Sequence, residues 1–319
     1  MIQFVLRRLL SVVFILWAMS ALIFAIVHIL PGNVAYAILG EYATPASIAV
    51  LEAKLGLNQP LVVQYWHWFT AMLHGDFGQS LTMDRPAGPE IMAALGRSAV
   101  LAGISFVLVV VLGIGSGIYA ATHKGQTSDR VLALGQFLSI AVPDFFWAIL
   151  AIIVFASWLH WLPATGYAPI AQAGFLSWLA HLVLPVAVLT LGLTAHVSRL
   201  TRSTMLETLE SRYVLAAYAK GLPRRLVLRR HALRNALPPT ITILAIDAGI
   251  LIGGIVVVET VFAYPGLGRL LVFAIERRDL PLLQAGMMVL TAIYAVANLI
   301  ADISYAMLNP RIRYGATMA

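Results

Sequence analysis

The sequence predicts an all-α integral membrane protein with six transmembrane helices. Of its 319 residues, 61% are hydrophobic and only 11% are charged, whereas soluble domains carry about 25% charged residues. Six largely apolar stretches are each long enough to cross a bilayer core, which takes about 20 helical residues. We therefore expect one transmembrane domain over residues 1–319, with spans at about 9–30, 99–122, 131–157, 181–200, 239–262 and 282–308.

The basic residues predict the orientation of these spans. With the N-terminus inside, the cytoplasmic segments hold fifteen Lys and Arg residues and the outer segments hold six. Basic residues are enriched in cytoplasmic loops, so both termini are expected in the cytoplasm, with an external loop at 31–98 and a cytoplasmic loop at 201–238. This topology role accounts for the net charge of +7, and the apolar composition leaves no soluble domain for nucleic acid.

Sequence signals of catalysis are missing from the chain. It contains no cysteine, which excludes a disulfide, a thiolate metal site and a cysteine nucleophile. The phosphate-binding pattern GxxxxGK[ST] is absent, as are HExxH and GxSxG. We therefore expect no catalytic, cofactor-binding or metal-binding residues in this chain, and no enzyme activity of its own.

Four acidic residues fall within or at the ends of the predicted spans: Asp144, Asp247, Glu259 and Asp302. A carboxylate at mid-bilayer costs about 2.5–3.5 kcal/mol, so each needs a polar partner or a water-filled cavity. For Asp144, Glu259 and Asp302 a structural role is favoured, and Glu259 is expected within reach of solvent at the outer end of its span. For Asp247, lining of a transport pathway and helix packing both stay open.

Small residues recur inside two spans. Gly113 and Gly117 form a GxxxG pair in the second span, and Gly249 and Gly253 form another in the fifth. Glycines at this spacing let helix backbones approach closely in lipid. Both pairs therefore predict helix–helix contacts.

A basic segment, Tyr213–Pro238, lies between two predicted spans. Ala216, Ala217 and Gly221 place small side chains within about a turn of one another, which favours close approach of another surface. Turns are expected near Pro223 and at Pro238-Pro239, where the chain should break before the fifth span. Anchoring to anionic lipid needs only the charge. The added pattern indicates a short helix that couples the membrane domain to a soluble partner.

The same segment resembles the cytoplasmic signature loop of permease subunits of binding-protein-dependent ABC importers. The pattern is matched at Ala216, Ala217, Gly221, Leu237 and Pro238, while Leu215 stands where an acid is usual. The AKGL…HALRNAL form seen here is typical of the dipeptide, oligopeptide and nickel branch of the family. The acid is often absent in that branch, so Leu215 also favours this branch over the others.

Further motifs of that branch occur in family order along nearly the whole chain. They are Gly75–Ser80, Trp161–Tyr167, Glu259–Arg269, Arg278–Pro281 and Asn309–Arg313. Two positions depart from the pattern: Pro31-Gly32-Asn33-Val34 replaces a frequent Pro-Gly-Asp-Pro, and Asp247 stands where an uncharged residue is more usual.

The resemblance implies a type I ABC importer permease in the cytoplasmic (inner) membrane of a bacterium or archaeon. It implies a second, homologous permease subunit as partner, usually in a heterodimer, together with two ABC ATPase subunits that bind ATP-Mg and an extracytoplasmic solute-binding protein. Expected cargo includes dipeptides, oligopeptides, nickel chelates, glutathione and opine-like compounds. The residues implied in ATPase coupling are Ala216, Ala217, Lys220, Gly221, Leu222, His231, Arg234 and Asn235.

Three other functions were weighed. An ion-coupled secondary transporter would use the intramembrane Asp and Glu residues and would need no ATPase. A respiratory or proton-channel subunit would require more paired charges inside the spans. A membrane scaffold would bind ATPase subunits without ATP-dependent flux. The pattern of the basic segment favours the ABC importer over all three.

Overall fold

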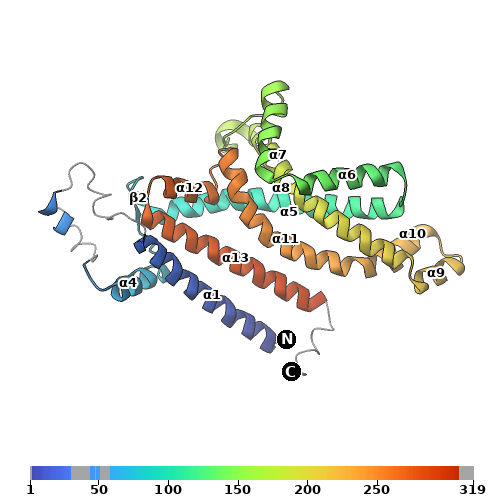
Figure 1. Ribbon diagram of the computed structural model, residues 1–319, viewed down its shortest axis with the longest axis horizontal. Helices are drawn as coiled ribbons and strands as arrows, with labels where there is room; N and C mark the ends of the chain where they lie inside the picture. Colours follow the sequence, from blue (N-terminus) through green and yellow to red (C-terminus); the bar gives the residue numbers. More distant parts are fainter. Residues whose placement is uncertain (1, 30–43, 47, 51–57, 309–319) are drawn as a thin grey trace. The chain divides into compact units, whose positions relative to one another are not determined.

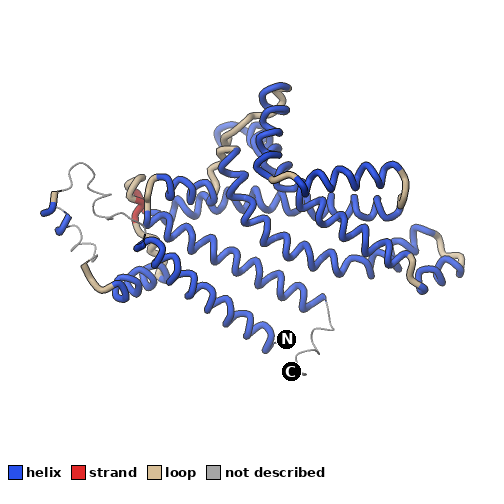
Figure 2. The backbone as a smooth tube through the Cα atoms, viewed as in Figure 1, coloured by secondary structure: helices blue, strands red, loops and turns tan. Residues whose placement is uncertain are grey.

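The protein is almost entirely helical in the computed structural model, which describes residues 2–29, 44–46, 48–50 and 58–308 (Figures 1 and 2). Within this part, five helices are long and apolar enough to cross a membrane, and a bent helix pair brings the number to six. The predicted all-α membrane class is confirmed. The motif residues 31–34 and 309–313 lie outside the described residues, and the cytoplasmic placement of the termini stays a prediction.

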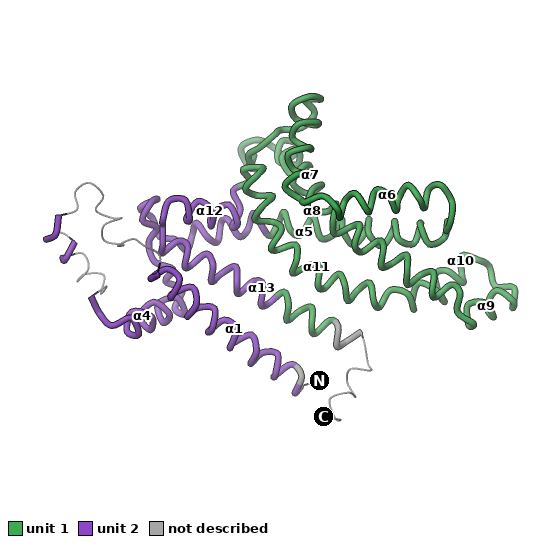
Figure 3. The backbone as a smooth tube through the Cα atoms, in the orientation of Figure 1, with its two compact units in different colours: residues 1, 99–264, 297–319 green, residues 2–98, 265–296 purple. Residues whose placement is uncertain are grey.

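The chain forms two compact units that alternate along the sequence (Figure 3). Unit 2 covers residues 2–98 and 265–296, and unit 1 covers 99–264 and the residues from 297 onward. Unit 2 contains α1 (Ile2–Ile29), α4 (Leu61–Leu73), β1 (Gln79–Ser80), β2 (Arg85–Pro86), the start of α5 (Ala87–Thr122), α12 (Leu267–Glu276) and most of α13 (Leu280–Leu308).

Unit 1 holds the remaining helices. They are the rest of α5, α6 (Thr127–Ala141), α7 (Asp144–Ala151), the π-helix η2 (Ile152–Trp158), α8 (Ile170–Leu209), α9 (Arg212–Ala219), α10 (Arg224–Leu226), the π-helix η3 (Val227–Ala232) and α11 (Leu233–Val261). Its largest core cluster joins Leu182 and Val188 of α8 to Leu251, Ile255 and Val258 of α11.

A buried carboxylate ties the small hairpin of unit 2 to the start of α13. The hairpin pairs β1 with β2 in antiparallel register. Asp279 is fully buried, and its Oδ2 accepts hydrogen bonds from the hydroxyls of Ser80 (2.5 Å) and Thr82 (2.8 Å) and from the Thr82 amide (3.1 Å). Its Oδ1 accepts from the Leu282 amide in the first turn of α13. Two of the quoted motifs, far apart in sequence, therefore meet at Asp279.

The predicted third span is bent rather than straight. α6 ends at Ala141, α7 begins at Asp144, and the two arms meet at an angle of 107°. Pro143 lacks an amide hydrogen and disfavours helical backbone in the residue before it. Val142 accordingly adopts an extended conformation, with φ −107° and ψ 130°. The stretch predicted as a span at 131–157 is therefore a pair of helices rather than one straight helix.

Pro238 and Pro239 do not break the chain as expected, because both lie inside α11. Helical structure continues from Arg224 through α10 and η3 into α11. The whole stretch Arg224–Val261 is long and apolar enough to form one membrane span. Prolines are tolerated in membrane helices because neighbouring groups and local adjustments of the helix re-satisfy the freed backbone groups. The loop predicted at 201–238 is therefore largely helical, and α8 itself continues to Leu209.

The glycine pair in α5 makes the close helix contact that its spacing predicts. A Cβ at Gly113 would stand 2.8 Å from Val197, and one at Gly117 would stand 2.6 Å from Thr201 and 2.7 Å from the Ser198 carbonyl, all on α8. The expectation for Gly253 is wrong within this chain, because a Cβ there would meet nothing within 4 Å.

Hydrogen bonds reinforce this packing inside the membrane domain. The Ser198 hydroxyl of α8 accepts from the Ser116 hydroxyl of α5 (2.8 Å) and from the Gln136 amide of α6 (2.7 Å). Thr201 and Thr240 join α8 to α11 through their hydroxyls at 3.2 Å. Polar side chains hydrogen-bonded between helices are stable in lipid because their alternative is an unpaired group. Three helices are thereby tied to α8.

We expect Gly117→Ala to lower the thermal midpoint of the purified protein in lipid nanodiscs by several degrees. The added methyl group collides with the α8 backbone, and overpacking of this kind costs about 1–3 kcal/mol. Gly115→Ala is the matched control, because a Cβ at Gly115 meets nothing within 4 Å. Equal thermal midpoints for the two variants would contradict the close α5–α8 contact.

The hairpin should lose its attachment to α13 at acidic pH. Burial alone would raise the pKa of Asp279, but the hydrogen bonds from Ser80, Thr82 and the Leu81 amide together hold that pKa below its usual range. A depressed pKa means that the attachment is fully present above about pH 4, the ordinary value for Asp, and is lost as pH falls through the lower folded value.

Hydrogen exchange at the Thr82 amide measures this attachment. Asp279→Asn should speed exchange at neutral pH by about tenfold, since hydrogen bonds to charged groups contribute about 1.5–3 kcal/mol, and should remove the acid dependence. Asp84→Asn is the control, because Asp84 is exposed at the hairpin turn. Unchanged exchange in Asp279→Asn would show that the carboxylate does not hold the hairpin.

Candidate functional site

The short helix α9 lies between two turns in the segment that the sequence singles out. It begins after Ser211, whose hydroxyl donates to the Thr208 carbonyl at 2.6 Å, and it ends at Ala219 with Lys220 as its C-cap. Its eight residues are too few to be stable alone in water. Contacts with the rest of unit 1 therefore hold it in place.

Gly221 ends α9 through its backbone conformation. Its φ is +76°, its amide donates to the Tyr218 carbonyl (2.9 Å), and the Leu222 amide donates to the Ala217 carbonyl (3.3 Å). These two bonds form a Schellman motif, and Leu222 packs against the apolar cluster of Val214, Ala217 and Val227. A Cβ at Gly221 would meet nothing within 4 Å. Gly221 is therefore required for the left-handed turn, and not for close packing within this chain.

The two alanines of the pattern differ in burial. Ala217 is buried with Val214 against Val227 of η3. Ala216 is exposed, and its neighbours Tyr213 and Leu215 are 46% and 56% exposed. α9 thus packs one face on its own chain and leaves an outer face, formed by Tyr213, Leu215 and Ala216, open to a partner.

Side-chain contacts attach this region to the ends of the membrane helices. The Arg224 guanidinium donates to the Thr122 carbonyl at the end of α5 (3.2 Å). Lys124 pairs with Glu210 at 2.8 Å, and its ammonium holds the pKa of that carboxyl below its usual range. A cavity of about 250 Å³ lies among these groups, lined also by Leu206, Tyr218 and Leu228.

A tighter ion pair fixes the α5–α6 turn to α8. The Asp129 carboxylate accepts two hydrogen bonds of 2.7 Å from the Arg202 guanidinium and one of 3.0 Å from the Gly125 amide. Such bidentate, charge-assisted pairs have well-defined geometry. The turn before α6 and the C-terminal part of α8 therefore move together.

The remaining predicted coupling residues lie along η3 and the start of α11. The Asn235 amide donates to the Tyr213 hydroxyl of α9 (3.1 Å) and to the His231 carbonyl (2.9 Å). Lys220 and Arg234 are exposed, and His231 and Leu222 are half-buried. Asn235 thus joins α9 to α11, and the predicted set lies in one contiguous region.

Asp247 of α11 is fully buried and pairs with His196 of α8. Its Oδ1 lies 3.0 Å from His196 Nδ1, while its Oδ2 has no hydrogen-bond partner among the described residues. The sequence analysis missed His196, because a lone histidine within a span carries no pattern. The only available signal was its place in a span that faces the one containing Asp247.

The other three acids have separate surroundings. Asp144 begins α7 and lies over two glycines: a Cβ at Gly192 or at Gly254 would stand 3.7 Å from one of its carboxylate oxygens. Glu259 is fully buried, so its expected exposure to solvent is wrong, because α11 packs this face inward. Asp302 is half-buried in α13. The four acids do not form one cluster, and among the described residues no three His, Asp or Glu side chains gather as metal ligands.

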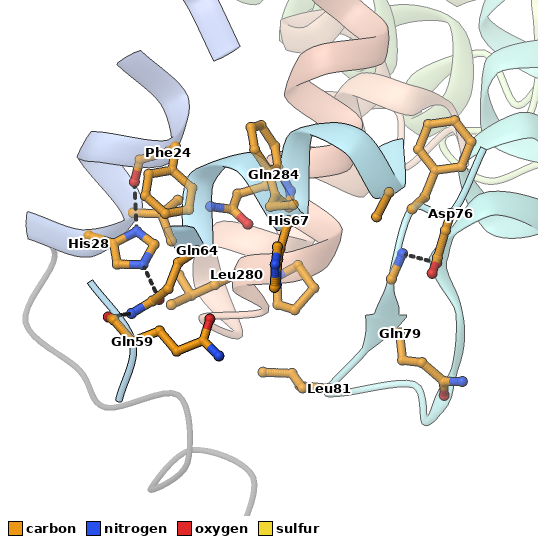
Figure 4. Close-up of a pocket in the computed structure, with 16 residues that line it drawn as sticks. Phe24, His28, Gln59, Gln64, His67, Asp76, Gln79, Leu81, Leu280 and Gln284 are labelled. Atoms are coloured by element: carbon orange, nitrogen blue, oxygen red, sulfur yellow. Dashed lines mark hydrogen bonds between the residues drawn. The ribbon is translucent and has the colours of Figure 1, made fainter. Parts of the chain in front are cut away.

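Unit 2 has a pocket of its own, of about 430 Å³ (Figure 4). His28 of α1 contacts the Phe24 carbonyl (2.8 Å) and the Gln64 side chain of α4 (3.3 Å), and Gln64 donates to the Gln59 carbonyl (2.8 Å). The pocket is also lined by Gln284 of α13 and by residues 76–79 of the Gly75–Ser80 motif. Amide groups and aromatic rings line this pocket without a charged cluster.

Comparison with known proteins identifies the family. Residues 113–314 match the family described as "Binding-protein-dependent transport system inner membrane component", and residues 1–88 match the N-terminal region of such membrane components. The first match alone covers more than half of the chain.

Relatives match over almost their full length. A probable peptide ABC transporter permease of Sinorhizobium fredii is 37% identical, covering 98% of this chain and 99% of that protein. A dipeptide transport system permease of Alkalihalophilus pseudofirmus is 35% identical, and a glutathione transport system permease of Salmonella choleraesuis is 38% identical; each match covers 98% of this chain and 100% of the relative.

The fold also agrees with a solved transporter. A crystal structure of an amino acid ABC transporter aligns with a TM-score of 0.50 and 15% identity, over 70% of this chain and 94% of that chain. Together with the membrane-spanning helices and the α9 region, these matches show that the chain belongs to the family of multi-pass inner-membrane permease subunits of binding-protein-dependent ABC transporters.

Proposed function

We propose that this chain forms one half of the translocation pathway of an ATP-driven importer for peptides or related small solutes. The observation that carries the proposal is the outer face of α9, which is open while the inner face is held by Val214 and Ala217. A short helix that is packed on one side and open on the other is suited to receive a soluble partner. We assign the open face to an ABC ATPase subunit.

The attachments of α9 explain how a partner's motion would reach the membrane. α9 is joined to α11 through Asn235 and Tyr213, to η3 through Val227, and the adjoining Arg224 contacts the end of α5. A displacement of α9 is therefore delivered to several spans at once. Coupling of two sites requires such an element with two arrangements.

The partners follow from the same assignment. ATP-Mg would be bound by two separate ATPase subunits, in keeping with the missing phosphate-binding pattern in this sequence. A second, homologous permease would complete the pathway in a heterodimer, and an extracytoplasmic solute-binding protein would deliver cargo. Membrane lipid surrounds the apolar faces.

Peptides are the favoured cargo because the quoted relatives are named for peptides, a dipeptide and glutathione. Nickel chelates and opine-like compounds stay predictions from the sequence. The ion-coupled carrier considered above gains no support from the family or the fold.

Ala216→Glu should abolish ATP-driven uptake in proteoliposomes that contain the permease pair, the ATPase subunits and the loaded binding protein. The added carboxylate stands on the open face of α9, where it keeps the ATPase surface away, while helix propensity changes by less than about 0.7 kcal/mol. We also expect at least a tenfold loss of ATPase stimulation by the binding protein.

Gln126→Glu is the matched control, since it makes the same charge change at an exposed site in the α5–α6 turn. Normal uptake together with normal retention of the ATPase subunits by Ala216→Glu would refute the assignment of the α9 face.

Substitutions at Gly221 test whether its backbone conformation matters for coupling. An alanine at a positive φ costs about 1–2 kcal/mol, whereas asparagine tolerates this region better. Uptake per ATP hydrolysed should therefore fall in the order Gly221, Gly221→Asn, Gly221→Ala. The reverse order, with the larger Asn more harmful than Ala, would mean that the position serves close contact with a partner.

A further inference from the structure

The C-terminal half of α8 has a polar, exposed face. His196, Arg199, Ser203 and Glu207 are all exposed and are spaced three or four residues apart, which places them on one side of the helix. The exposed large hydrophobic side chains of α8 all lie in its N-terminal half, among them Phe175, Leu176 and Val183. The character of the exposed surface therefore changes along a single helix.

Of these four residues, His196 and Arg199 lie within the predicted span 181–200, whereas Ser203 and Glu207 lie in the predicted cytoplasmic segment. A polar side chain inside the span indicates water rather than lipid on that side. Ionisable side chains in spans face the bundle interior or a water-filled cavity, because contact with hydrocarbon is costly. His196 is 47% exposed in this chain and lies in the C-terminal half of the 40-residue helix α8. This face of α8 is suited to line a pathway shared with a second subunit.

The pairing with Asp247 fixes what His196 offers to that pathway. Asp247 is fully buried and contacts Nδ1 of the ring, and a net charge there would be uncompensated and costly. Two forms of the pair are neutral overall: imidazolium with carboxylate, and neutral imidazole with carboxylic acid. In both forms Nε2 carries a hydrogen, because in the second the acid donates to Nδ1. In either neutral form, Nε2 is a hydrogen-bond donor.

Arg199 adds a second donor one turn further along the same face. No hydrogen bond or ion pair joins its guanidinium to any described residue, in contrast to the nearby Arg202, which is held by Asp129. Guanidinium groups bind carboxylates through two parallel hydrogen bonds. A donor ring nitrogen and an uncommitted guanidinium on one face form a receptor for an anion.

We propose that His196 and Arg199 form a subsite that takes the carboxylate group of the cargo as it passes, and that Asp247 is the positioning residue that keeps His196 Nε2 protonated. This rests on the proposed function, in which the chain lines a solute pathway. Peptides carry such a carboxylate at the C-terminus, so the subsite fits that class of cargo.

The absence of cysteine in the chain allows a direct test in the complete reconstituted complex. Ser203→Cys places one thiol a turn from Arg199 on the polar face. Its labelling rate is measured with an anionic probe, 2-sulfonatoethyl methanethiosulfonate, and with a cationic probe, 2-(trimethylammonio)ethyl methanethiosulfonate. The ratio of the two rates, relative to that of a free thiol in solution, should be raised by about tenfold, as expected for one charge-assisted hydrogen bond.

Second substitutions separate a subsite from general charge. In the Ser203→Cys background, Arg199→Gln and His196→Leu should each lower the ratio by at least fivefold, while His196→Gln, which keeps a donor near the Nε2 position, should stay within twofold. Arg230→Gln removes an exposed charge on η3 and should have no effect. Asp247→Asn should lower the ratio about twofold, because the ring can then present either tautomer.

Several results would overturn the proposal. An unreactive Ser203→Cys would place the face in lipid, as expected for the control Phe137→Cys on the apolar face of α6. Equal ratios in His196→Leu and His196→Gln would exclude the donor role, and a raised ratio in Asp247→Asn would exclude the neutral pair. ATPase stimulation by the binding protein, measured on the same samples, reports separately on the importer function.

Discussion

The close contact between the backbones of α5 and α8 is the constraint on which unit 1 depends. Gly113 and Gly117 leave no side chain between the helices, and this lets Ser198 receive hydrogen bonds from both Ser116 and Gln136. In lipid, burial of apolar surface does not drive helices together, so short distances and shared hydrogen bonds must do so. With α8 fixed in this way, different side chains along it can serve different purposes.

Both proposed sites involve α8. The last turns of α8 carry Arg202, which is held by Asp129, and lead directly into α9. Less than two turns before Arg202, α8 carries His196, which is paired with Asp247 of α11. α11 in turn continues back through η3 to the residues that pack on α9. The same two helices therefore connect the proposed docking face to the proposed carboxylate subsite.

Composition and spacing predicted the membrane class, most of the helices and the position of α9, because these depend on local apolar length and on a pattern within a few residues. Features set by tertiary contacts were not predictable. Gly221 was interpreted by size, although its positive φ decides its role, and Glu259 was placed near solvent although α11 buries it. His196 gained meaning only when α8 was packed beside α11.

The bend at Pro143 has a consequence for how the protein enters the membrane. α6 and the arm formed by α7 and η2 each have about fifteen residues, or roughly 22 Å of helix, which is shorter than the hydrocarbon core of about 30 Å. Neither arm can cross alone during synthesis at the ribosome. The insertion machinery must accept both arms together, or retain the first until α8 emerges to pack against it.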